Sequence, residues 1–180
     1  MRYGTIDFET IIHQSSNELD KGSLVLRISP QSNNKVIYHL GKKFGCHPST
    51  ALKLLQFAKK LELNVIGISF HIGSGCVEAG AFEAAIELSR RVFDLGHSVG
   101  FNMHILDIGG GFPGEKNVQT NITFEKIAND VNLSLNKYFP GNDVRIIAEP
   151  GRYYVASAFT IATNIITKKI VTDDENVLPS

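Results

Sequence analysis

Short apolar runs alternate with longer amphipathic stretches along most of the chain. The runs span residues 4–7, 24–28, 65–70, 104–108 and 144–148, and the first of them is the weakest. The last four show little polar alternation, which is typical of strands that are buried on both faces of a parallel sheet. The pattern therefore predicts five strands of one parallel sheet.

Helical periodicity fills the intervals between these runs. It predicts a helix over residues 51–63 opened by Pro48-Ser49-Thr50, a helix over 81–95 that ends at Gly96, and a helix over 124–139 stopped by Pro140-Gly141. A shorter first helix is expected to start within residues 9–13, with Asp7 as its candidate cap. The side chains expected on the buried helix faces are Leu52, Leu55, Ala58 and Leu61, then Ala85, Leu88, Val92 and Leu95, and then Phe124, Ile127, Val131, Leu135 and Tyr138.

A series of alternating strands and helices with right-handed crossovers forms either a doubly wound open sheet or a stretch of (β/α)8 barrel. Five strands do not close an eight-stranded barrel, and complete barrels take roughly 200 residues or more. We therefore expect an α/β fold built as an incomplete TIM-type barrel, in a truncated unit. Residues 153–171 are predicted to form a long β-rich run, followed by a frayed acidic tail.

The composition is that of one ordinary soluble domain. The chain has 180 residues, of which 43% are hydrophobic, and its 18 basic and 18 acidic residues balance. This balance gives no electrostatic reason to expect nucleic acid or an anionic membrane as a partner. Cys46 and Cys76 lie far apart and form no CxxC pair, which disfavours a disulfide scaffold or a zinc site. With no membrane-spanning run and no signal peptide, the sequence predicts a cytoplasmic protein.

Most of the unusual chemistry follows directly after the strands. In both candidate architectures the active site lies at the carboxyl ends of the strands, so these residues are expected to converge on one rim. They are Arg27 after the second run, His71, Gly73, Ser74, Gly75 and Cys76 after the third, Asp107, Gly109, Gly110, Gly111, Phe112, Pro113 and Gly114 after the fourth, and Glu149, Pro150, Gly151, Arg152 and Tyr153 after the fifth.

Three of these features favour a phosphate-bearing ligand when they are taken together. The glycine run 109–111 either serves a tight turn that needs positive φ or offers backbone N–H groups to a phosphate. Ser74 is either part of a plain loop or a hydroxyl contact for phosphate oxygens. Arg152 is either a structural surface arginine or a charge-assisted fork to the same anion. The run is not a GxGxxG motif, so a dinucleotide is disfavoured.

Glu149 and His71 are the residues that point to a particular kind of ligand. A carboxylate at a buried strand end needs a partner, which is either Arg27 or Arg152 or the protonated ring nitrogen of pyridoxal phosphate. His71 is either a core histidine bonded to the backbone or a flat ring that stacks on a cofactor. Asp107 either joins this group or caps the glycine loop. We expect His97 and His104 to lie on the surface, outside the rim.

Three long motifs resemble the eukaryotic ornithine decarboxylase family, of the pyridoxal-phosphate-dependent ornithine, lysine and arginine decarboxylases. They are SerPheHisIleGlySerGlyCys at 69–76, LeuAspIleGlyGlyGlyPheProGly at 106–114 and AlaGluProGlyArgTyrTyrValAlaSerAlaPheThr at 148–160. LeuValLeuArgIle at 24–28 and LysPheGly at 43–45 fall at the expected intervals, and the resemblance runs from about residue 3 to about 171.

The resemblance implies an alanine-racemase-like barrel that binds pyridoxal phosphate and decarboxylates ornithine to putrescine in polyamine biosynthesis. It also implies a homodimer, with Lys43 bridging to the partner subunit. The resemblance implies that His71 stacks on the cofactor ring and that Glu149 holds the pyridine nitrogen. It implies phosphate contacts from Ser74, Gly111, Gly151 and Arg152. It also implies that Gly109, Gly110 and Pro150 of the same motifs bind the cofactor, and that Arg27 and Asp107 line the mouth of the site, Arg27 as a further cofactor-binding residue.

The chain also departs from the family pattern. The TyrAlaValLys-type motif with the Schiff-base lysine is absent, as is the C-terminal β domain with its Cys-Asp pair. We therefore expect residues 1–160 to be part of the barrel, residues 161–180 to begin the missing domain, and the chain alone to be an inactive fragment of a decarboxylase. Two alternatives remain: an inactive antizyme-inhibitor-like protein that binds antizyme, and a decarboxylase of arginine, lysine or diaminopimelate. Intact motif residues favour an enzymatic parent.

Overall fold

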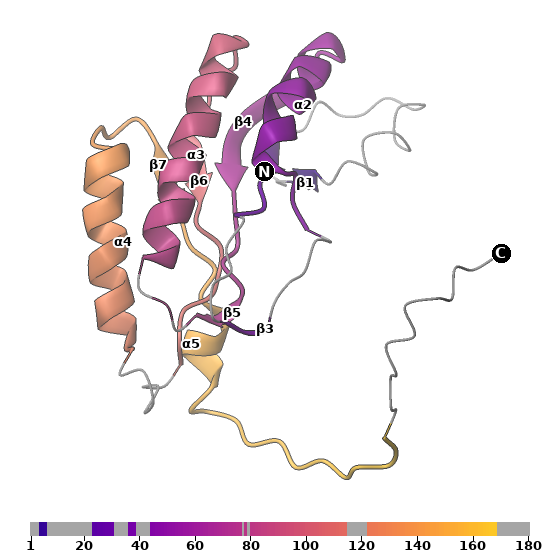
Figure 1. Ribbon diagram of the computed structural model, residues 1–180, viewed down its shortest axis with the longest axis vertical. Helices are drawn as coiled ribbons and strands as arrows, with labels where there is room; N and C mark the ends of the chain where they lie inside the picture. Colours follow the sequence, from indigo (N-terminus) through magenta and orange to yellow (C-terminus); the bar gives the residue numbers. More distant parts are fainter. Residues whose placement is uncertain are drawn as a thin grey trace, which may run out of the picture.

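A parallel sheet covered by helices forms the body of the molecule (Figure 1). The computed structural model describes residues 4–6, 23–30, 36–38, 44–76, 78, 80–114 and 122–168. The strands of this sheet are β1 (Gly4–Ile6), β2 (Ser23–Arg27), β4 (Asn64–Ser69), β6 (Ile105–Asp107) and β7 (Arg145–Ile147), and every neighbouring pair is parallel. The predicted strands are thus confirmed to within one or two residues at their ends.

The strand order decides between the two candidate architectures. The strands lie in the order β1-β2-β4-β6-β7, so each lies beside the next sheet strand along the chain. A doubly wound sheet reverses its order at a switch point and carries helices on both faces, whereas a barrel does neither. Helices α2 (Pro48–Lys60), α3 (Ala81–Ser98) and α4 (Phe124–Tyr138) lie side by side over one face (Figure 1). The fold is α/β, and its order is that of a stretch of barrel.

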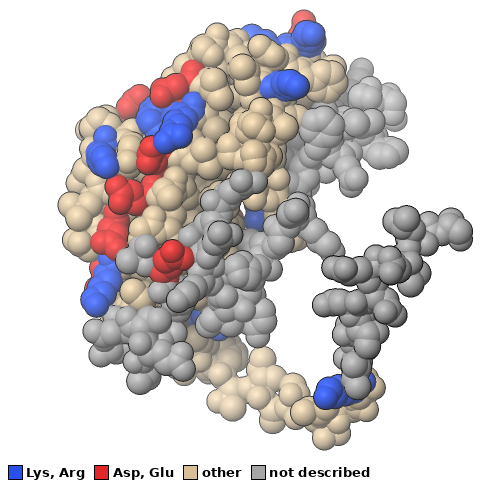
Figure 2. Space-filling view, viewed as in Figure 1, with Lys and Arg blue, Asp and Glu red and all other residues tan. Residues whose placement is uncertain are grey.

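Helices α2 and α4 begin at polar caps that the sequence supplies. His47 Nδ1 accepts a hydrogen bond from the Ser49 N–H at 3.1 Å at the start of α2, and Thr123 Oγ1 accepts from the Lys126 N–H at 3.4 Å at the start of α4. The outer face of α3 and α4 carries three ion pairs, which are Arg90–Asp94, Arg91–Glu87 and Lys137–Glu83. Figure 2 shows the mixed charges on this face. No helix in the described ranges has the length and apolar character needed to cross a bilayer.

Two predictions about the helices needed correction. The buried face of α2 consists of Ala51, Leu54, Leu55 and Ala58, while Leu61 is 43% exposed because it follows the last helical turn. Helix α3 does not stop at Gly96. A Cβ on Gly96 would overlap the sulfur and methyl group of Met103, so this glycine permits close packing and does not end the helix.

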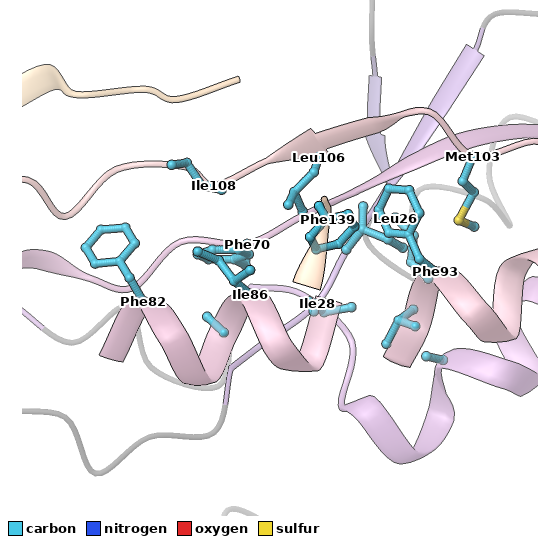
Figure 3. Packing of buried hydrophobic residues seen from close by; sticks show 14 of the residues in the cluster. Leu26, Ile28, Phe70, Phe82, Ile86, Phe93, Met103, Leu106, Ile108 and Phe139 are labelled. Atoms are coloured by element: carbon cyan, nitrogen blue, oxygen red, sulfur yellow. The ribbon is translucent and has the colours of Figure 1, made fainter. Parts of the chain in front are cut away.

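Between the sheet and the helices lies the main apolar core (Figure 3). Its sheet side carries residues such as Leu26, Ile28, Phe70, Leu106 and Ile108, and its helix side carries residues such as Ala51, Leu55, Phe82, Ala85, Ile86, Val92, Phe93, Ile127 and Val131. Val25, Ile66 and Ile105 form a smaller cluster on the other face of the sheet, with Ile147 packed against it. Both sheet faces therefore bury apolar side chains, as the uninterrupted apolar runs predicted.

Strand β7 is the exception to that rule. Arg145 is exposed, Ile146 is 37% exposed and Ile147 is only half-buried. In the described part of the chain β7 pairs with β6 alone, so it is the edge of the sheet. The prediction that this strand is buried on both faces is therefore wrong here, because the sheet has no further described strand or helix to cover it.

Two further elements were not predicted. Strand β3 (Val36–Tyr38) pairs antiparallel with β5 (Ser74–Cys76), so Ser74 lies in a strand and not in a loop. Residues 151–155 form the short helix α5 (Gly151–Val155), and residues 159–168 have no regular structure. The predicted β-rich run is therefore wrong for residues 153–168. Its apolar side chains Phe159, Ile161, Ile165 and Ile166 are at least 72% exposed, and without a neighbouring strand β-propensity alone does not form a sheet.

Several predictions fall on residues outside the described ranges. They concern the helix starting at 9–13, its cap Asp7, the subunit bridge at Lys43 and the acidic tail. The proposed boundary between residues 160 and 161 also stays a prediction.

Candidate functional site

The carboxyl ends of the strands bring the predicted residues to one rim. In the register of the sheet, Arg27 on β2 lies opposite Ser69 on β4, and Ser69 lies opposite Asp107 on β6. Asp107 in turn pairs with Ile147, two residues before Glu149. Parallel strands that end together present their following loops on the same side, so the loops after β2, β4, β6 and β7 are neighbours.

The imidazole of His71 lies against the glycine loop after β6. A Cβ on Gly110 would come within 2.7 Å of His71 Nε2 and 3.0 Å of the Glu149 carbonyl oxygen. His71 Nδ1 accepts a hydrogen bond from the Gly73 N–H at 2.9 Å, which leaves the proton of the neutral ring on Nε2. Burial, with a smaller contribution from the Arg27 guanidinium, lowers the pKa of His71, although the Glu149 carboxylate opposes this shift. The ring is therefore neutral near pH 7.

Asp107 caps the glycine loop. Its Oδ1 accepts a hydrogen bond from the Gly109 N–H at 2.9 Å, which confirms the interpretation that Asp107 caps this loop. Burial raises the pKa of Asp107 and the charge of Glu149 raises it further, while the Gly109 hydrogen bond and Arg27 lower it. The same charged groups act on Asp107 and on His71, so Arg27, His71, Asp107 and Glu149 form one electrostatic unit.

Close packing requires each glycine of the run 109–111, against the His71 ring at Gly110 and against neighbouring backbone at Gly109 and Gly111. Gly109 has φ +59°, and a Cβ there would overlap the Phe70 carbonyl oxygen. Gly111 has φ +118°, and a Cβ there would lie 2.9 Å from the Gly73 carbonyl oxygen. The loops after β4 and β6 thus touch through their main chains, and the Cys76 N–H donates to the Gly111 carbonyl at 3.1 Å. Tight loop packing accounts for the glycines without any ligand.

Arg152 and Ser74 meet across this rim. Arg152 Nη2 donates to Ser74 Oγ at 2.9 Å, and Arg152 Nε lies 3.2 Å from the same oxygen. Ser74 is half-buried, whereas Arg152 is exposed and retains further N–H donors. Next to it, a Cβ on Gly151 would have no atom within 4 Å. A cationic fork, a hydroxyl and an open backbone position therefore lie together.

Glu149 occupies a more open position than the sequence predicted. Its main chain is fixed, because its N–H donates to the Gly109 carbonyl at 2.8 Å and its carbonyl accepts from the Gly151 N–H at 2.9 Å. Its side chain is exposed, since it follows the edge strand β7, so the expectation of a buried strand-end carboxylate is wrong here. Neither Arg27 nor Arg152 forms an ion pair with Glu149 in the part of the chain that the structure describes. Pro150 precedes α5.

Arg27 lies at the rim and forms no ion pair with any residue that the structure describes. Its guanidinium carbon lies 5.1 Å from the centre of the Phe44 ring, a cation–π contact. The exposure of His97 and His104 confirms that both are surface residues.

Ser69 is a rim residue that the sequence reasoning missed. It is 8% exposed, and its Oγ has no hydrogen-bond partner among the described residues. The period of two along β4 was a usable signal, because Ser69 lies two residues before His71 and in register with Arg27 and Asp107.

Comparison with known proteins agrees with the resemblance. A family profile described as "Pyridoxal-dependent decarboxylase, pyridoxal binding domain" matches residues 1–156. Ornithine decarboxylase of Mus musculus is 49% identical over 179 residues, covering 96% of this chain and 38% of that protein. Antizyme inhibitor 2 of Xenopus laevis is 46% identical over 176 residues, covering 95% of this chain and 38% of that protein.

Solved structures agree as well. A lysine decarboxylase of Selenomonas ruminantium superposes with a TM-score of 0.69 at 33% identity, over 84% of this chain and 39% of that one. The chain thus spans about 38% of the length of the curated relatives reported above. Since the family profile covers most of the chain, the chain belongs to the family of pyridoxal-dependent decarboxylases and carries their pyridoxal-binding domain.

Proposed function

We propose that this chain supplies the pyridoxal-phosphate-binding rim of a decarboxylase that converts ornithine to putrescine. The observation that carries the proposal is the meeting of Arg152 with Ser74 on the rim where His71 lies against Gly110. Local packing explains the glycine run, but it does not explain why an exposed arginine converges on a half-buried hydroxyl at the rim that also carries a neutral imidazole.

The residues at one end of the rim fit a phosphate group. The Arg152 guanidinium and the Ser74 hydroxyl supply donors to a dianion, and a guanidinium matches the geometry of phosphate oxygens. Gly151 lets the ligand approach the main chain, since nothing lies where its Cβ would be. Gly109, Gly110 and Gly111 contribute by keeping the neighbouring loop free of side chains.

The residues at the other end fit a protonated pyridine ring. The neutral His71 imidazole, held by the Gly73 N–H, offers a flat face without a positive charge. The exposed Glu149 carboxylate is available to accept a hydrogen bond from a protonated ring nitrogen. When bound, the cofactor supplies an electron sink for the electrons that remain when the α-carboxylate of the substrate leaves. Arg27 and Asp107 adjust the charge around this end.

The activity, the substrate and the partners are proposed for a full-length protein of this family and not for these 180 residues alone. The 49% identity to mouse ornithine decarboxylase supports ornithine as the substrate. We also propose a homodimer and a cytoplasmic location for that protein.

A segment exchange tests the proposal. The matching segment of mouse ornithine decarboxylase is replaced by residues 1–180 of this chain, and carbon dioxide release is measured with ornithine, lysine and arginine. We expect turnover with ornithine as the preferred substrate, and loss of that turnover when Arg152→Ala is introduced into the exchanged segment. A folded hybrid that does not bind pyridoxal phosphate would contradict the proposed rim.

A regulatory binding protein is the second candidate, supported by the 46% identity to antizyme inhibitor 2 of Xenopus laevis. Against it stand His71, Ser74, Glu149 and Arg152, which are all intact. If the hybrid folds and binds antizyme but releases no carbon dioxide from any of the three amino acids, this second function replaces the first.

A further inference from the structure

A continuous row of contacting aromatic rings connects the core to the end of the rim where Arg152 lies. Phe70 contacts Phe82 with ring centres 6.5 Å apart, Phe82 contacts Phe112 at 4.9 Å, and Phe112 contacts Phe124 at 5.8 Å. The last link is the tightest, because Phe124 and Tyr153 stack with centres 4.1 Å apart and ring planes 29° from parallel. Figure 3 shows the buried end of this row of rings, at Phe70 and Phe82.

Three residues of this aromatic row adjoin rim residues in the sequence. Phe70 precedes His71, Phe112 follows Gly111, and Tyr153 follows Arg152. The rings of Phe70, Phe82 and Phe112 are at most 5% exposed, so the inner part of the aromatic row belongs to the rigid core. The outer ring, Tyr153, is 37% exposed and reaches that core through Phe124.

Helix α5 has few other attachments to the described part of the body. It contains no buried residue, so its position is not held by an apolar face of its own. A Cβ on Gly114 would lie 2.6 Å from the Arg152 carbonyl oxygen, which brings the main chain of α5 close to the loop after β6. Besides that approach, the contacts that join α5 to the other described elements are the Arg152–Ser74 hydrogen bonds and the stack of Tyr153 on Phe124.

We propose that Phe124 and Tyr153 are positioning residues for the phosphate end of the site. Their stack fixes α5 against the start of α4 and so holds the Arg152 guanidinium over Ser74 before the ligand arrives. Neither ring touches the ligand. The inference rests on the proposed function, since it assumes that Arg152 and Ser74 receive the phosphate group of pyridoxal phosphate.

Two ligands that differ only in the phosphate provide the test. The full chain is titrated with pyridoxal phosphate and with pyridoxal, and binding is followed by the ligand's absorbance. The variants are Phe124→Leu and Tyr153→Leu, which keep an apolar side chain but remove the stack, and Tyr153→Phe, which keeps it. Tyr154→Leu is the matched control, since Tyr154 is the next residue of α5 and is 70% exposed.

An aromatic pair stabilises its geometry enough to change an equilibrium about three- to tenfold. We therefore expect pyridoxal phosphate to bind about three- to tenfold more weakly to Phe124→Leu and to Tyr153→Leu, with the affinity for pyridoxal changed less than twofold. Tyr153→Phe and Tyr154→Leu should bind both ligands like the wild type. The double variant should be no weaker than either single one, because both lose the same contact.

Two results would overturn the inference while leaving the proposed function intact. One is an unchanged affinity for pyridoxal phosphate in both leucine variants, while Arg152→Lys weakens it. The other is an equal loss of affinity for both ligands, which would mean general loosening of the rim. If the wild type binds pyridoxal phosphate no better than pyridoxal and Arg152→Lys has no effect, the phosphate end of the proposed function fails, and the positioning role fails with it.

Discussion

Alanine substitution along the rim glycines separates close packing from backbone conformation. Gly110 does not have a positive φ, so alanine there meets only a steric obstacle: His71 Nε2 at 2.7 Å and the Glu149 carbonyl oxygen at 3.0 Å. Overpacking of this kind costs about 1–3 kcal/mol. Because the Gly73 N–H holds the imidazole, the ring cannot turn away without losing a hydrogen bond. We expect Gly110→Ala to lower the free energy of unfolding by that amount.

Two other glycines calibrate this result. Gly111 has φ +118°, and its Cβ would lie 2.9 Å from the Gly73 carbonyl oxygen, which belongs to the main chain and cannot swing aside. Backbone strain of about 1–3 kcal/mol adds to a similar packing cost, so Gly111→Ala should lose roughly 2–6 kcal/mol. Gly151 has open space and no positive φ, so Gly151→Ala should be neutral or gain up to about 1 kcal/mol from lower entropy of the unfolded chain.

Urea denaturation of the purified chain, followed by far-UV circular dichroism, measures the three free energies. The expected order of stability is Gly151→Ala first, then Gly110→Ala, then Gly111→Ala. A Gly110→Ala protein as stable as Gly151→Ala would refute the contact between His71 and the glycine loop. A Gly111→Ala protein more stable than Gly110→Ala would refute the claim that main-chain contact joins the two loops.

Three further predictions follow from single side chains. Ser69→Ala removes a buried hydroxyl that has no partner among the residues described, so the free energy of unfolding in urea should rise by about 1 kcal/mol; a fall would reveal a partner such as a buried water. Arg152→Lys should weaken pyridoxal phosphate roughly 5- to 30-fold in an absorbance titration, because lysine cannot reproduce the guanidinium fork; equal affinity would remove Arg152 from the phosphate site. Because the folded state lowers the pKa of His71 below its usual 6.5, the unfolded chain takes up this proton first as the pH falls. The His71 contribution to stability is therefore complete above pH 6.5 and is lost below it. The free energy of unfolding of the wild type, relative to that of His71→Asn, should fall from pH 7.5 to 5.5. A difference that stays constant over this range would contradict a neutral His71 ring in the folded state.

Much of the architecture could be read from the chain. Buried strands and amphipathic helices each have a characteristic period, and the predicted runs match β2, β4, β6 and β7 closely. The errors lie where a distant segment decides the outcome. Gly96 has the composition of a helix end, yet α3 continues through it because Met103 packs against it. The run after Gly151 has the composition of a strand, yet no described strand lies beside it.

The candidate site shows the same division. The motifs around His71, Asp107, Glu149 and Arg152 indicated one rim, and the register of the parallel strands brings them there. The sequence reasoning assumed that Glu149 was buried, but burial depends on what covers β7, and no local pattern reports that. It overlooked Ser69 because serine in an apolar strand carries no signal until its neighbours on adjacent strands are known.

What the sequence determined by itself is the alternation of strands and helices and the placing of polar residues at strand ends, since both are properties of residues close together in the chain. Only the tertiary structure decided why Gly109, Gly110 and Gly111 must be glycine, which oxygen Arg152 reaches, and which ring Tyr153 stacks on. Each of these is a contact between segments far apart in sequence, and packing of whole elements sets such distances.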